Sequence, residues 1–151
     1  MILTVPNSIM LGEVSRMIAE GHPVVIMTKG NSMLPFIRGE MDNVELVSPA
    51  DPKVGDIALG QTAPGQYVLH RIIAVDGDTF TLKGDGNLRG TETCTRDNIC
   101  GKVSFILRKG GRKIDCGKPG FLRCSAFWRN LPCPARRTVL AIYRRLIKIF
   151  R

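Results

Sequence analysis

The chain has 151 residues, and its 44% hydrophobic content is enough to bury the core of one small domain. Its charge is sharply divided, because residues 1–100 carry a net charge of −4 and residues 101–151 carry +13. No uncharged apolar run approaches the ~20 residues that cross a bilayer. Glu13 and Arg16 interrupt the only early apolar stretch, so we expect neither a membrane-spanning helix nor a signal peptide.

The first predicted element is a helix within an N-terminal segment, residues 1–23. Asn7 or Ser8 can cap this helix, which is expected to run to about Glu20 and to stop at Gly21. Its apolar face would be formed by Ile9, Met10, Val14, Met17 and Ile18.

A serine follows the next predicted element, a short buried strand over residues 24–28. Gly30 allows a tight backbone path after the strand, and Pro35 fixes φ where the chain turns away. Ser32 lies between them, where a hydroxyl can be exposed beside free backbone N–H groups, as a serine nucleophile requires. Met33, next to this serine, is the apolar residue of the segment that we expect to contact a substrate.

Further strands are predicted downstream, and they define a mainly β domain over residues 24–116. One short strand covers residues 54–59, and a longer one covers residues 65–75 with His70 in its middle. The dipeptide that follows, Asp76-Gly77, is a hairpin turn signal, and residues 79–87 return as the partner strand.

Four motifs follow one another along this region: S-M-x-P, then G-D-[IV], then H-R-[IV]-[IV], then K-G-D-x-N. In this order, within residues 24–104, they resemble the catalytic domain of the signal peptidase I / LexA-type serine peptidase superfamily. The His-Arg pair is most similar to the branch that uses histidine. The resemblance implies a coiled β-sheet fold and a serine endopeptidase that cleaves a leader or precursor peptide with Ser32 and His70.

The chemistry of the residues supports the same pair. A serine hydroxyl is too weak an acid to attack near neutral pH without a base, and histidine is suited to take its proton. A carboxylate should orient the histidine. Asp85 is the leading choice, and the acidic pair that the resemblance implies after K-G-D-x-N makes Glu92 its rival. The resemblance also points to a departure at Gly30, where many relatives carry a hydroxyl, so backbone N–H groups, including that of Ser32, would form the oxyanion hole.

The basic C-terminal part is expected to hold a linker with a packed helical turn, residues 117–134, and an amphipathic helix, residues 135–151. One broad face of that helix is apolar, and arginines with one lysine cover much of the other. This pattern is typical of a helix that lies in an anionic membrane interface, although a helix docked on the domain is nearly as well supported. Nucleic acid fits the aliphatic face poorly. We expect a cytoplasmic protein that can attach to the inner membrane surface through residues 135–151.

Metal and cofactor sites are not expected. The five cysteines, odd in number, match no zinc-ligand spacing and are predicted to be reduced thiols. Two alternatives to a peptidase with a peptide or protein substrate remain open at this point. One is a non-catalytic peptide-binding module on the same fold, and the other is a LexA-like self-cleaving regulator, for which some 30 residues ahead of Ser32 leave little room for a DNA-binding domain.

Overall fold

Strands dominate the structure, a computed structural model that describes residues 2–3 and 8–150. More of these residues lie in strands than in helices, which confirms the mainly β prediction. The strands form one sheet in the order β1-β2-β3-β8-β4-β5-β6-β7, with β9 paired to β8, and every pair except β1–β2 is antiparallel. The elements are β1 (Ile2–Leu3), α1 (Ser8–Ala19), β2 (Val24–Met27), β3 (Asn43–Val47), β4 (Ile57–Ala63), β5 (Gln66–Asp76), β6 (Thr79–Lys83), β7 (Glu92–Thr95), the 3-10 helix η1 (Arg96–Asn98), β8 (Ile99–Leu107), β9 (Lys113–Asp115), α2 (Pro119–Asn130) and α3 (Cys133–Phe150).

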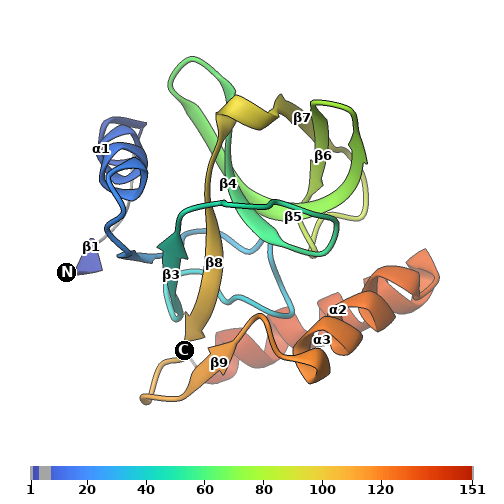
Figure 1. Ribbon diagram of the computed structural model, residues 1–151. Helices are drawn as coiled ribbons and strands as arrows, with labels where there is room; N and C mark the ends of the chain where they lie inside the picture. Colours follow the sequence, from blue (N-terminus) through green and yellow to red (C-terminus); the bar gives the residue numbers. More distant parts are fainter. Residues whose placement is uncertain (1, 4–7, 151) are drawn as a thin grey trace.

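The sheet is strongly curved rather than flat (Figure 1). β8 explains part of this shape, since its first residues pair with β4 while the rest of it pairs with β3. Strands β4 to β7 curl into a rounded half. One side of the sheet carries α1, and α2 and α3 lie together at the opposite end of the molecule (Figure 1).

The β5–β6 hairpin forms where Asp76-Gly77 predicts it. Asp76 pairs with Thr79, so Gly77 and Asp78 are the two turn residues. Gly77 has φ 58°, a left-handed conformation that costs glycine little.

Three buried clusters fill the spaces around the sheet. The largest lies between α1 and β2, β3 and β8, and it includes two apolar residues of the loop after β2, Met33 and Ile37. A second lies inside the rounded half of the sheet and is built from Ala58, Ile72, Phe80, Leu82, Cys94 and Ile99. The third joins the helices to that same loop through Leu34, Trp128, Leu140 and Ile147.

The helices show one agreement and one correction. α1 covers the predicted span and is followed by Gly21, whose φ is 89°. The segment 117–134 holds more than the predicted linker with one helical turn, because Pro119–Asn130 forms a helix of 12 residues. Pro119 occupies the first helical turn, where a missing N–H costs nothing, and Pro132 lies just beyond the last helical residue, so these two prolines mark the ends of a helix rather than a break in structure. Among the described residues, no helix is both long and apolar enough to cross a membrane.

Candidate active site

Ser32 lies half-buried in the loop that joins β2 to β3. Gly30, two residues earlier, has φ 77°, which favours glycine. Gly39, on the returning part of the loop, packs against Gly30 so closely that a Cβ there would overlap the Gly30 carbonyl group. The loop therefore closes tightly on itself, and two glycines are required for that closure.

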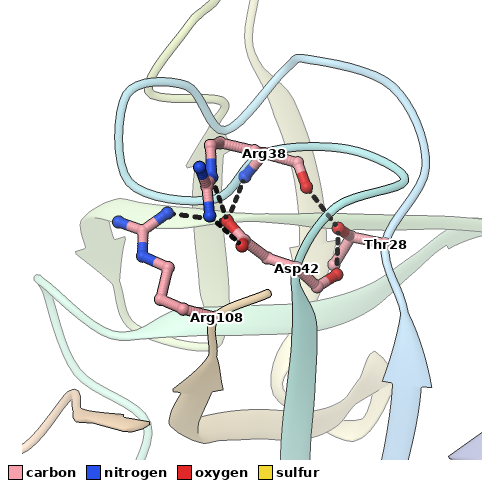
Figure 2. Close-up of polar contacts among 4 residues, drawn as sticks. All are labelled: Thr28, Arg38, Asp42 and Arg108. Carbon is pink, nitrogen blue, oxygen red and sulfur yellow. Dashed lines mark hydrogen bonds and ion pairs between the residues drawn. The ribbon is translucent and has the colours of Figure 1, made fainter. Parts of the chain in front are cut away.

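A buried polar network holds the base of this loop (Figure 2). The Thr28 hydroxyl donates to the backbone oxygen of Asp42 at 2.9 Å, which ties the two ends of the loop together. The Asp42 carboxylate is fully buried and accepts hydrogen bonds from the guanidinium groups of Arg38 and Arg108. Burial alone would raise the pKa of Asp42, but the hydrogen bonds from Arg38 and the charge of Arg108 outweigh it and hold that pKa below its ordinary value.

His70 reaches the serine from β5. Its Nε2 atom lies 3.2 Å from Ser32 Oγ, and its Nδ1 atom lies 3.0 Å from Oε2 of Glu92 on β7. In the tautomer that carries its proton on Nδ1, the ring donates to the carboxylate and accepts from the hydroxyl. This is the order of contacts in which a base takes the proton of a serine nucleophile.

The register of the sheet explains why Glu92 is the partner. Ile72 pairs with Leu82, and Leu82 pairs with Glu92, so these three side chains share one face of the sheet. His70 precedes Ile72 by two residues on the same strand and therefore lies on that face as well. The Glu92 side chain, 34% exposed, reaches the imidazole from the strand beyond β6.

Asp85, the leading choice for the carboxylate that orients His70, is not bonded to His70. The structure therefore does not support the expectation that Asp85 contacts the imidazole. Arg71 alternates with His70 along β5, so it points to the opposite face, and it pairs with Lys83, two residues before Asp85. The Asp85 carboxylate accepts hydrogen bonds from Arg71 Nε at 2.9 Å and Nη2 at 2.7 Å, and both side chains are buried. Asp85 is thus engaged by an arginine rather than by the histidine.

This ion pair nevertheless lies close to the serine. The Trp128 indole donates to the backbone oxygen of Asp85 at 2.9 Å, and the next residue, Gly86, donates its N–H to the backbone oxygen of Ser32 at 2.8 Å. The Arg71 guanidinium also lies over the rings of Phe36 and Phe121. The sequence alone predicts no role for Arg71 or Trp128. The H-R dipeptide is a sequence signal for the first, whereas the proline-bracketed aromatic segment that holds Trp128 predicts packing but not the contact with Asp85.

A cavity of about 270 Å³ opens beside Ser32 and His70. Its other walls come from α1, β2, the loop after β2, β4 and β5, and they are largely apolar. Met33 lines this cavity, as expected of a substrate contact, but it is also 4% exposed and belongs to the main buried cluster. Within the described residues, no acceptor is bonded to the N–H of Ser32, which leaves that donor available to an oxyanion.

The first half of β5 offers an edge for an extended chain. Residues 66–70 pair with β4 on one side, whereas β6 joins β5 only from Arg71 onward. In the part of the chain that the structure describes, no strand pairs with the other side of residues 66–70. The free edge ends at His70 and borders the cavity, because Tyr67, Val68 and Leu69 contribute to both.

Neither a disulfide nor a cluster of metal ligands occurs in the part of the chain that the structure describes. All five cysteines are free, and burial raises the pKa of Cys116 to about 12 and also raises that of Cys94. Within residues 2–3 and 8–150, no group of three or more His, Cys, Asp or Glu side chains is placed to share a metal ion.

Comparisons with known proteins add nothing to this geometry. No protein-family model matches the chain, and a search of curated proteins returns no match. Any assignment of function therefore depends on the contacts of Ser32, His70 and Glu92 themselves.

Proposed function

We propose that this protein is a serine endopeptidase of signal-peptidase type, in which Ser32 is the nucleophile, His70 the general base and Glu92 the residue that orients the base. The observation that carries the proposal is the continuous set of contacts from Ser32 Oγ through both nitrogens of His70 to Glu92, beside an apolar cavity. A chance contact between a loop serine and a strand histidine would not require a carboxylate on the second nitrogen.

Each residue has a defined part in the reaction. Ser32 Oγ attacks the peptide carbonyl carbon while His70 Nε2 takes the hydroxyl proton, and the Ser32 N–H stabilises the oxyanion. His70 then gives that proton to the leaving amine as the C–N bond breaks and an acyl-enzyme ester remains. Water attacks the ester, passes a proton to His70, and the acid product leaves as Ser32 regains its hydrogen. Glu92 stabilises the imidazolium form in both halves of the cycle.

The proposed substrate is an extended leader or precursor peptide. The free edge of residues 66–70 can pair with the peptide backbone, as in β-strand addition, and leads it to His70. Because side chains of a strand alternate in direction, one residue beside the cut would point into the cavity. Apolar walls and a volume of about 270 Å³ suit one small or medium apolar side chain there.

A library of extended peptides, analysed by mass spectrometry, tests the proposal. The full chain should cleave a subset of the library, and Ser32→Ala, His70→Ala and the double variant should all be equally inactive, because residues that act as one unit are not additive. Binding of library peptides without cleavage by the wild-type chain would favour the peptide-binding module instead. Cleavage that survives Ser32→Ala would contradict the proposal outright.

A further inference from the structure

The outer surface of α3 carries an apolar row that the fold leaves uncovered. Four side chains at helical spacings of three and four residues form this outer row, and they are exposed by 41, 54, 44 and 72%: Val139, Ile142, Leu146 and Ile149. Large aliphatic side chains that are adjacent, exposed and on one helix face indicate an interaction surface more strongly than scattered ones do.

A second row on the same helix faces the domain. Leu140 and Ile147 are 2% and 7% exposed and pack with Trp128 and Leu34, and Tyr143 lies half-buried between them. The single broad apolar face that the sequence predicts for this helix therefore divides into a buried inner row and an exposed outer row. The inner row already anchors α3 to the loop that carries Ser32, so the outer row is not required for docking of the helix on its own domain.

Positive charge adjoins the outer row. Arg145 lies three residues after Ile142 and four residues before Ile149, which makes it a direct surface neighbour of both. Beyond it, Arg137, Arg144 and Lys148 form an exposed basic row at spacings of seven and four residues. No acidic residue occurs in α2 or α3 to neutralise these side chains.

We infer that the outer row of α3, with Arg145 beside it, binds the surface of an anionic lipid bilayer, while the basic row, on the far side of the helix from the outer row, adds to the positive potential that attracts the membrane. The aliphatic side chains of the outer row enter the boundary between headgroups and acyl chains, while Arg145 keeps its charge at the headgroups. A second copy of this chain would bring arginine against arginine, and a nucleic acid would leave the outer row in water. An anionic and partly apolar surface suits the outer row and Arg145 by contact, and it suits the basic row by longer-range attraction.

Vesicle co-sedimentation of the full chain tests the inference. Vesicles of phosphatidylcholine with phosphatidylglycerol should bind the protein, pure phosphatidylcholine vesicles should bind it at least tenfold more weakly, and salt should release it. Changing Ile142→Ser and Ile149→Ser together should weaken binding at least tenfold, since apolar burial contributes to membrane affinity beyond charge. The matched control, Val54→Ser with Val75→Ser, changes two exposed valines away from α3, one in the turn before β4 and one on β5, and should bind like wild type.

A second pair of variants isolates charge. Neutralising Arg145 with glutamine should lower affinity roughly fivefold, whereas the same change at the exposed residue Arg112 should have a much smaller effect. Trp128, the sole tryptophan, is 5% exposed beneath α3, so its unchanged emission in each variant shows that the helix remains docked.

Three results would overturn the inference. They are equal binding to neutral and anionic vesicles or none to either, wild-type binding by the Ile142/Ile149 variant, and a dimer in the absence of lipid that the same variant dissociates. The inference does not depend on catalysis, so Ser32→Ala should bind vesicles as wild type does, and failure of one proposal leaves the other intact.

Discussion

Gly84→Ala should uncouple the proposed catalytic residues without changing any of them. A Cβ at Gly84 would lie well under 3.0 Å from the Ser32 backbone oxygen, 3.0 Å from Asn87 Nδ2 and 3.2 Å from His70 Nε2. Because the first of these contacts is with backbone, the chain must move rather than a flexible side chain. An ordinary contact requires a shift of about 1 Å, and a misplacement of that size costs about a hundredfold in rate.

The assay compares two glycine variants on one cleaved peptide. Gly84→Ala should lower kcat/KM about a hundredfold while destabilising the fold by about 1–3 kcal/mol, the usual cost of overpacking. Gly120→Ala is the matched control, since among the described residues no heavy atom other than those of its chain neighbours and its own helix backbone lies within 4 Å of the added Cβ, and it should keep wild-type kcat/KM. Both are measured well below the unfolding midpoint. Wild-type kcat/KM in a folded Gly84→Ala protein would refute the idea that this glycine sets the distance between Ser32 and His70.

Three further outcomes follow from the buried polar groups. Asp42→Asn should lower the free energy of unfolding at pH 7 by about 3–5 kcal/mol, because two arginines lose their buried partner. Since the pKa of Asp42 is lowered in the fold, its contribution to the free energy of unfolding is present above the ordinary aspartate pKa of about 4 and is lost as the pH falls further. Urea titrations of the Asn variant at several pH values should therefore lack that part of the loss of stability in acid. Arg71→Lys should lower the free energy of unfolding by a similar amount, because an ammonium group cannot replace the bidentate contact with Asp85. A urea midpoint equal to that of the wild type would contradict this prediction. At pH 8, iodoacetamide should alkylate exposed Cys133 well before Cys116, whose raised pKa leaves little thiolate, as peptide mass spectrometry would show; the reverse order would refute it.

Local signals predicted the elements that local chemistry controls. Asp76-Gly77 places a hairpin because the turn conformation itself favours those residues, and Gly21 ends α1 for the same kind of reason. The pairing of Ser32 with His70 was predictable only as a resemblance in motif order. Their 3.2 Å contact depends on the loop after β2 folding back beside β5, which no local pattern encodes.

The carboxylate that orients His70 could not be identified from the sequence alone. Asp85 is nearer than Glu92 to His70 in the chain, but proximity in sequence does not decide which face of a sheet a side chain occupies. The β5–β6–β7 register places Glu92 on the face of His70 and brings Asp85 to Arg71. For a related reason, the sequence predicts only a helical turn within residues 117–134, where the structure has the 12-residue helix α2. Prolines at both ends of α2 carry the same local signal as prolines in a linker, and only the burial of Trp128 against the domain distinguishes them.

Covalent capture of Ser32 tests the central claim most directly. A peptidyl phosphonate diester, built on a cleaved library peptide, bonds through phosphorus to an activated serine and loses one aryloxide. Intact-mass and fragment spectra should show one addition per chain, located on Ser32, abolished by Ser32→Ala and slowed at least a hundredfold by His70→Ala. Glu92→Gln should also slow it, while Asp85→Asn in folded protein should slow it less. Modification at another residue, or labelling of Ser32 at an unchanged rate without His70, would contradict the account.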